Sequence, residues 1–148
     1  MTRPSSLDSK LPEYLNPPVV EVAASIQFAN IKGLNAARLG LLWSRFRDKY
    51  PRTEQHSPLA TASETFESTR SGRVGFSVET SFPAPRLWFL SSDGTRLVQV
   101  QSNRLVVNWR QLDTGEPYLR FSGLMSMLTE AVQLLGVFLD EEKLGNIA

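Results

Sequence analysis

Polar and aromatic side chains on the predicted strands are the residues of this sequence best suited to binding chemistry. Strands predicted between positions 19 and 28 and between 86 and 111 place them on one face, because successive strand side chains alternate between faces. Amide side chains donate and accept hydrogen bonds, a guanidinium grips a carboxylate or a phosphate, and an aromatic ring stacks. The candidate binding face comprises Gln27, Trp88, Gln99, Gln101, Asn108 and Arg110, with Glu21 beside them and Phe89 as the alternative to Trp88.

Two plainer interpretations of this face are also open. Antiparallel sheets are commonly wet on one side, so polar cross-strand pairs can simply face water. They can also pack against another part of the protein. We favour these plainer interpretations on frequency alone. Trp43 and Trp109 are better explained as core residues, because each lies on an apolar stripe.

The single histidine, His56, does not indicate a catalytic or metal site. A relay or a metal centre would have to be built around it within positions 52–72, which are predicted to be irregular. Glu54, Glu64 and Glu67 could share a divalent cation with it, but their spacing matches neither a metal-binding helix nor an EF-hand loop. A solvated polar loop explains these residues better. We predict no catalytic residue, no metal ligand and no cofactor.

The other carboxylates and the glycines add no active-site pattern. Asp140, Glu141 and Glu142 are consecutive at a predicted helix end, where solvation explains them better than an acid and base pair. Gly72 and Gly75 stand at no strand-to-helix junction, so they form no phosphate cradle. A non-enzymatic role is therefore favoured over an enzyme.

Composition predicts one ordinary globular domain. The length of 148 residues is that of a single domain, and 41% hydrophobic with 21% charged residues is typical of a chain that folds. A net charge of +1 gives little support to nucleic-acid binding, which usually shows a strongly basic surface. Arg96, Arg104 and Arg110 around Trp88 nevertheless suit a platform for single-stranded nucleic acid, so that alternative is kept.

The sequence contains no cysteine, which excludes disulfides, thiolate catalysis and cysteine-based metal sites and suits a reducing compartment. The first ten residues lack the apolar centre of a signal peptide. No stretch reaches the roughly 18 to 20 uninterrupted apolar residues of a membrane span. We expect a cytoplasmic protein that contacts no membrane.

The predicted elements follow the order strand, helix, four strands, helix. Helical spacing of apolar residues predicts helices from a cap at Asn35 to Tyr50 and from about Tyr118 to Leu139. The strands are predicted over 19–28, 73–80, 86–91, 96–101 and 104–111, with turns at Asp93-Gly94 and Ser102-Asn103.

These elements predict an α+β fold in which two amphipathic helices pack on one face of a mainly antiparallel sheet of about five strands. We expect positions 1–18 to form an extended N-terminal segment and 19–145 to form a single domain. The side chains expected to face the helices are Val20, Val22, Ile26, Leu105, Val107 and Trp109. The apolar stripe of the last helix contains Phe121, Leu124, Leu128, Ala131, Val132, Leu135 and Phe138.

Four segments stand out as possible family motifs. They are LPEYLNPPVVEV from Leu11 to Val22, Trp43 with Arg47 and Tyr50-Pro51, PRLWF from Pro85 to Phe89, and QVQSNRLVVNWR from Gln99 to Arg110. Their order and spacing resemble a sporadically distributed bacterial family of uncharacterised proteins. The resemblance implies a fold frame but no activity, cofactor or catalytic residue. Members of that family usually continue for about a further domain, so the resemblance implies that this chain corresponds to their N-terminal half.

The leading hypothesis is a non-enzymatic module that recognises another protein through its open sheet face or an edge strand. The patchy distribution of the family that it resembles implies a role in defence or in neutralising a toxin. One alternative is a nucleic-acid or nucleotide binder that uses the aromatic and arginine residues. Another is half of an enzyme that a C-terminal region completes. A homodimer through the edge strand or the uncovered face is also open.

Overall fold

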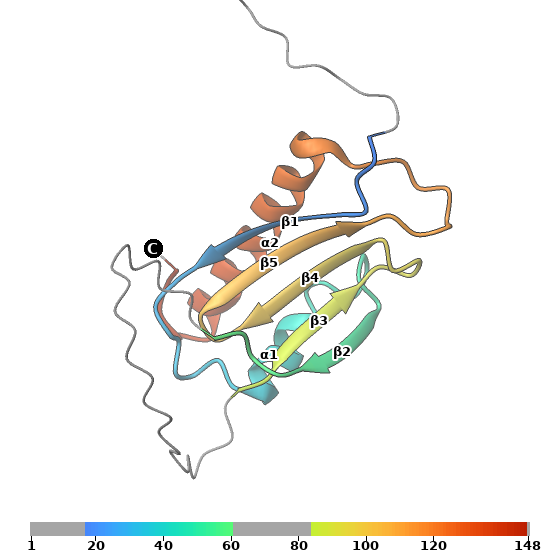
Figure 1. The fold of residues 1–148 in the computed structure, drawn as a ribbon. Coiled ribbons are helices and arrows are strands. Elements are labelled where there is room, and N and C mark those ends of the chain that lie inside the picture. The colour runs from blue at the N-terminus through green and yellow to red at the C-terminus, as the bar shows by residue number, and fades with distance from the viewer. Residues whose placement is uncertain (1–16, 61–83, 148) are drawn as a thin grey trace, which may run out of the picture.

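The computed structural model describes residues 17–60 and 84–147, and the structural statements that follow concern these ranges. The predicted α+β class and the order of strand, helix, four strands and helix are confirmed. Along the chain the elements are β1 (Glu21–Gln27), α1 (Ala36–Trp43), β2 (Arg52–His56), β3 (Arg86–Leu90), β4 (Arg96–Gln101), β5 (Arg104–Arg110) and α2 (Arg120–Glu141) (Figure 1).

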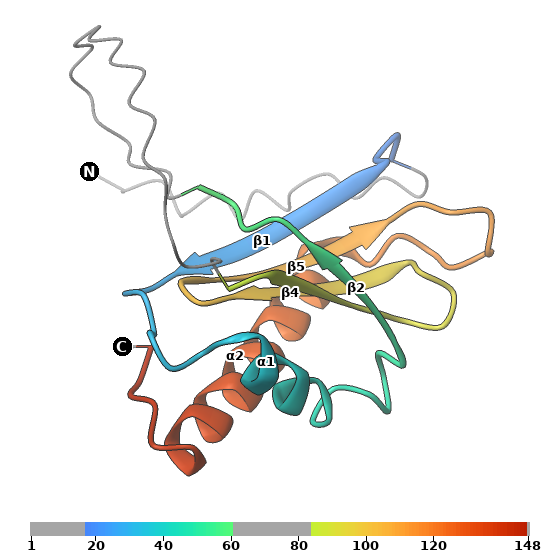
Figure 2. The same ribbon diagram turned by 90° about the horizontal axis from the view of Figure 1, so that it is seen from below.

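The five described strands form one antiparallel sheet with the order β1-β5-β4-β3-β2. β1 and β2 are consecutive strands but form the two opposite edges, and α1 lies on one side of the sheet in the connection between them (Figure 2). β2 to β5 then run back as a meander that ends beside β1. Glu21 pairs with Arg110 and Gln27 pairs with Arg104, so β1 lies along the full length of β5.

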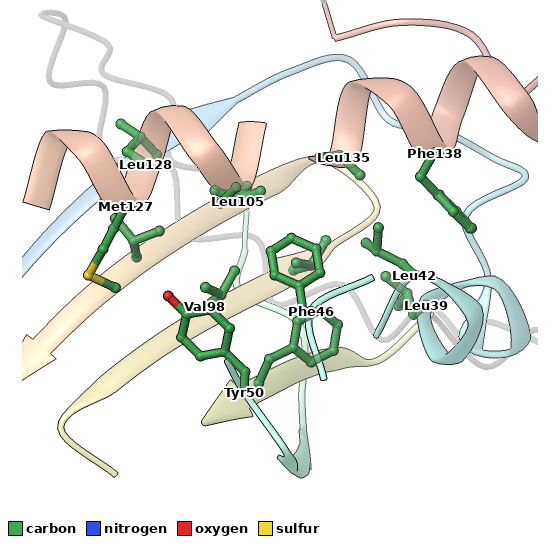
Figure 3. Close-up of a cluster of buried hydrophobic side chains, with 14 of the residues drawn as sticks. Leu39, Leu42, Phe46, Tyr50, Val98, Leu105, Met127, Leu128, Leu135 and Phe138 are labelled. Atoms are coloured by element: carbon green, nitrogen blue, oxygen red, sulfur yellow. The ribbon is translucent and has the colours of Figure 1, made fainter. Parts of the chain in front are cut away.

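Both helices pack on the same face of the sheet, and the core lies between them and the strands (Figures 2 and 3). Phe89, Val98 and Leu105 supply fully buried side chains from three strands. Leu42 of α1 and Leu135 of α2 are fully buried against them. Burying a side chain of this kind stabilises a fold by about 1.5–3 kcal/mol, so this apolar layer is the main source of stability.

Strand alternation predicts most of the helix-facing residues correctly. Leu105, Val107 and Trp109 are buried, and Trp109 makes an edge-to-face contact with Tyr118 at a centroid distance of 5.1 Å. The prediction is wrong for Val20, which is 72% exposed. Val20 precedes the first residue of β1, so it lies beyond the area of sheet that the helices cover.

α1 is shorter than predicted. Asn35 caps its start as expected, because the Asn35 Oδ1 accepts a hydrogen bond from the Arg38 backbone N–H at 3.1 Å. The predicted extension to Tyr50 is wrong, since the regular helix ends at Trp43. Turns follow in which the backbone hydrogen bonds span either three or four residues. The Phe46 N–H donates to Trp43 O at 2.8 Å, and the Tyr50 N–H donates to Phe46 O at 2.8 Å. These turns keep Phe46 and Tyr50 buried without a continuous helix.

α2 spans 22 residues and has the length and apolar composition of a membrane-crossing helix, a test that core helices also pass. Leu124, Leu128 and Leu135 of its predicted stripe lie in the core, which accounts for much of this apolar character. Phe121 was expected on the same stripe but is 75% exposed. It lies in the first turn of the helix, before Leu124, which is the first α2 residue buried in the core.

β2 is the element that sequence reasoning missed. Positions 52–56 were expected to be irregular, but they pair with β3 from Arg52↔Leu90 to His56↔Arg86. The strand reads RTEQH and four of its five residues are exposed, so it has no apolar alternation to detect. An edge strand of this kind is held by backbone hydrogen bonds to its neighbour rather than by burial. The strand predicted over 73–80 lies outside the described residues.

Candidate functional site

The six residues of the candidate binding face all lie on the side of the sheet away from the helices, which we call the open face. Trp88 pairs with Gln99, Gln101 pairs with Arg104, and Glu21 pairs with Arg110, so strand alternation brings them to one side. Phe89 is fully buried in the core on the other side, which leaves Trp88 as the aromatic residue of the open face.

A chain of side-chain hydrogen bonds crosses the open face over four strands. The Asn108 Nδ2 donates to Glu21 Oε1 at 2.8 Å, and the Gln99 Nε2 donates to Asn108 Oδ1 at 2.8 Å. The Arg86 Nη1 donates to Gln99 Oε1 at 3.1 Å. Gln99 and Asn108 are only 7% and 6% exposed, so these bonds satisfy amides that burial would otherwise penalise. The two amides therefore hold the strands in register and present little to a ligand.

Gln101 is occupied by the chain that follows β2. Its Oε1 accepts from the Leu59 N–H at 2.8 Å, and its Nε2 donates to Leu59 O at 3.0 Å. The side-chain amide thus copies the pairing of a neighbouring strand and holds Ser57–Ala60 on the open face, where Figure 2 shows the chain after β2 on the side opposite the helices. Gln101 is 3% exposed and serves as an anchor rather than as a binding residue.

Arg110 also forms hydrogen bonds within the fold, whereas Gln27 is exposed. The Arg110 Nε and Nη2 donate to Gly94 O at 3.3 and 2.9 Å. Gly94 has a φ of +77° in the turn between β3 and β4, so the arginine holds this turn against β5. Gln27 ends β1 and is exposed. The predicted face is thus one surface, but three of its amides and its arginine bond to the protein itself.

One row of residues crosses all five strands at the end of the open face near the turn between β4 and β5. His56 pairs with Arg86, Gln101 pairs with Arg104, and Arg104 pairs with Gln27. The pair Leu87↔Val100 places Arg86 level with Gln101. We call this set, His56, Arg86, Gln101, Arg104 and Gln27, the terminal row. It is rich in hydrogen-bond donors and carries two arginine charges.

Trp88 lies next to the terminal row, and its ring is already in contact with two neighbours. The His56 ring stacks on it at a centroid distance of 3.9 Å and an angle of 25°. The guanidinium carbon of Arg86 lies 5.6 Å from the ring centroid, within cation–π range. The His56 Nε2 is 3.1 Å from Glu54 Oε2. His56 is therefore part of a packed cluster on a strand rather than a ligand in an irregular loop.

Arg86 and Arg104 are the residues that sequence reasoning did not select for the site, although Arg104 was counted in the nucleic-acid alternative. Burial lowers the pKa of Arg86, and the positive charge of Arg104 lowers it further. The available signal was alternation: Arg86 stands two positions before Trp88, and Arg104 faces Gln101 across a two-residue turn. The placement of Arg96 around Trp88 is wrong, because Arg96 pairs with Trp109 and so lies on the helix side of the sheet; its Nη2 is 3.7 Å from Glu116 Oε2.

Two hollows adjoin these elements. A cleft of about 990 Å³ opens at the β2 edge, where His56, Lys32 and Ser102 contribute to its wall. A smaller cavity of about 170 Å³ lies between helix α2 and the turns that follow α1, beside Tyr50 and Glu130. The described part of the chain holds no group of three or more histidine, aspartate or glutamate side chains placed to share a metal ion.

Comparison of the chain with models of protein families, with curated proteins and with solved structures found no match. The resemblance to a bacterial family therefore stays a prediction.

Proposed function

We propose that this chain is a non-enzymatic protein-interaction module that binds an extended segment of another protein along the outer edge of β1. The observation that carries the proposal is the edge itself. β1 is seven residues long, stands at the end of the strand order, and pairs on one side only among the described strands. An edge of this kind offers a row of backbone donors and acceptors to an added strand.

The hydrogen bonds that flank β1 define which backbone groups point outward. The Phe28 N–H donates to Asn103 O at 3.0 Å, and the Gln111 N–H donates to Val20 O at 2.8 Å. In an antiparallel ladder, bonded pairs alternate with non-bonded pairs. Val22, Ala24 and Ile26 therefore bond to β5. The N–H and C=O groups of Glu21, Ala23, Ser25 and Gln27 point to the free edge.

β1 lacks the features that usually protect an edge strand from pairing. Natural edges carry lysine, proline, bulges or inward charges. Positions 22–26 read VAASI, with small side chains at the centre and no charge or proline. β2, the other edge, carries Arg52, Glu54 and His56 within five residues. The contrast favours β1 as the edge that takes a partner.

A second copy of the chain fits β1 as well, because the strand complements itself. An antiparallel register centred on Ala24 pairs Ala23 with Ser25 of the other copy, and both present outward backbone groups. The same register pairs Val22 with Ile26, both half-buried on the helix side, and brings no like charges together. A homodimer is thus the competing occupant that the experiment must distinguish from a different protein.

The test compares Ser25→Pro with Ser25→Val. Proline removes the outward N–H of residue 25 and leaves the bonds to β5 in place, whereas valine keeps the N–H and suits a strand. We expect the proline variant to stay folded and to lose the partner that wild-type chain and Ser25→Val capture. Sedimentation of the purified chain shows whether that partner is a second copy. Equal partner binding by both variants would exclude β1 as the interaction site.

The alternatives receive less support from the geometry. A platform for single-stranded nucleic acid needs an accessible ring, and the ring of Trp88 is already stacked by His56 and approached by Arg86. Nucleic-acid binding would also weaken steeply with salt, which a titration can measure. An enzyme completed by a further region, and a role in defence or toxin neutralisation, stay hypotheses that rest on the resemblance alone.

A further inference from the structure

We propose that Arg86 and Arg104 form a binding site for an oxyanion at the terminal row, and that a phosphate group suits the site better than a carboxylate. The site is independent of strand addition at β1, because it uses side chains of the open face rather than backbone groups of the edge. Its evidence consists of the placement of the two arginines, their unsatisfied donors and the absence of a matching negative charge in the described part of the chain.

The register places Arg86 and Arg104 on either side of Gln101. Arg86 is on β3 and Arg104 is on β5, so two strand spacings, about 9.6 Å, separate their backbones. Arginine side chains are long enough to meet across this distance. The positive charge of Arg104 also contributes to lowering the pKa of Arg86, after burial. Two cations held this close repel each other unless an anion lies near them.

Both arginines and the neighbouring indole carry buried donors without a partner. The Arg86 Nε, the Arg104 Nε and the Trp88 Nε1 are shielded from solvent, and none has a hydrogen-bond partner within the described residues. A buried donor left unsatisfied costs about 1–3 kcal/mol. Three such N–H groups in one cluster are unusual, since buried polar groups are nearly always bonded. An oxyanion can accept hydrogen bonds from these donors once the side chains over them shift, because an atom that water cannot reach is closed to a phosphate oxygen of similar size as well.

The fold holds the two arginine side chains in place. The Arg86 Nη1 donates to Gln99 Oε1 at 3.1 Å, at the end of the chain of bonds that begins at Glu21. The Arg104 Nη2 donates to Ala60 O at 3.3 Å, next to the point where Gln101 binds Leu59. Donors that are already oriented lose little freedom when a ligand binds, and shielding from water strengthens their attraction for an anion.

The nearby carboxylates are committed elsewhere. Glu54 Oε2 lies 3.1 Å from His56 Nε2, and Glu21 Oε1 accepts from Asn108 at 2.8 Å. No described carboxylate lies within 4.0 Å of a nitrogen of Arg86 or Arg104. Two positive charges match a dianionic phosphate, and tetrahedral oxygens can accept from donors that do not share a plane. A carboxylate would leave one charge unmatched.

The experiment follows the indole N–H of Trp88 by NMR while inorganic phosphate is added to the full chain at low salt. Trp88→Phe identifies this resonance among the three tryptophans. We expect a saturable shift with phosphate and with a phosphate monoester, and at least about tenfold weaker binding of acetate. Arg86→Lys and Arg104→Lys keep the charge but remove the Nε–H donor, so each should weaken phosphate binding about tenfold.

Arg96→Lys is the matched control, because Arg96 lies outside the terminal row and should leave phosphate affinity unchanged. Amide spectra establish that each variant is folded. No saturable shift with phosphate, or equal weakening by Arg96→Lys, would overturn the site. Acetate binding as tight as phosphate would overturn the preference for a dianion. Ser25→Pro should bind phosphate like wild type, so failure at β1 and failure at this site are distinguishable.

Discussion

At the scale of single residues, most polar groups of the open face act on the protein itself. Gln101 replaces a strand partner for Leu59, and Arg110 binds the carbonyl of Gly94. Such groups have the chemistry of a binding site but few donors or acceptors to spare. Residue type and face therefore do not suffice to identify a ligand contact, and the unsatisfied donors of Arg86 and Arg104 are the more informative observation.

The raised pKa of Tyr50 predicts that the protein loses stability at alkaline pH. Burial raises the pKa of its phenol, the charge of Glu130 raises it further, and Arg96 opposes them. Since the folded pKa lies above the unfolded value of about 10, the neutral phenol favours folding below that pH. This contribution is lost as the pH rises through the folded pKa. Above pH 10, the melting temperature should fall more steeply with pH for wild type than for Tyr50→Phe. Parallel curves would contradict the assignment.

The lowered pKa of Asp93 predicts that the protein loses stability at acidic pH. Its Oδ1 accepts from Ser91 Oγ at 2.7 Å, from the Thr95 N–H at 3.0 Å and from Thr95 Oγ1 at 2.8 Å. These bonds lower the pKa of Asp93, so its contribution is present above the unfolded value of about 3.9 and lost as the pH falls through the folded pKa. At pH 7, Asp93→Ala should destabilise the fold by about 1 kcal/mol. Urea unfolding should show that this difference shrinks below pH 4; a constant difference would refute the role of the carboxylate.

At the scale of elements, the end of α2 offers a stabilising change. Lys143 adopts a φ of +55°, and the Leu144 N–H donates to Leu139 O at 2.9 Å, the pattern in which glycine is usual. Lys143→Gly should therefore raise the free energy of unfolding by roughly 0.5–1 kcal/mol. Lys143→Ala removes the same charge and keeps the strain, so it is the control. Equal stability of the two variants would show that strain at this position is negligible.

Elements with an apolar period were predictable from the sequence, and elements without one were not. Alternation in β4 and β5 predicted the faces of Gln99, Gln101, Asn108 and Arg110, and Asn35 marked the start of α1 correctly. β2 has no apolar alternation by which to predict it, and its pairing with β3 holds it in the sheet. The contact of Gln101 with Leu59 joins positions 42 residues apart, and local patterns carry no information on such a contact. The candidate face was therefore predictable as a surface but not in its internal bonding.

At the scale of the whole described fold, the outer edge of β1 has no partner strand among the described strands. α1 and α2 cover one face, and Ser57–Ala60 lies across part of the other (Figure 2). β5, the last strand of the meander, forms the backbone hydrogen bonds to the inner side of β1. The outward groups of Ala23 and Ser25 then stand where an added strand would extend the sheet. The proposal of strand addition at β1 rests on the strand order and on the composition of this strand.

Amide hydrogen exchange across β1, compared between the free chain and the isolated complex with its captured partner, tests this claim most directly. In the free chain, Val22, Ala24 and Ile26 should be protected, because their N–H groups bond to β5, while Ala23 and Ser25 should exchange quickly. In the complex, Ala23 and Ser25 should become protected as well. Rapid exchange of Ala23 and Ser25 in both states would contradict strand addition at β1.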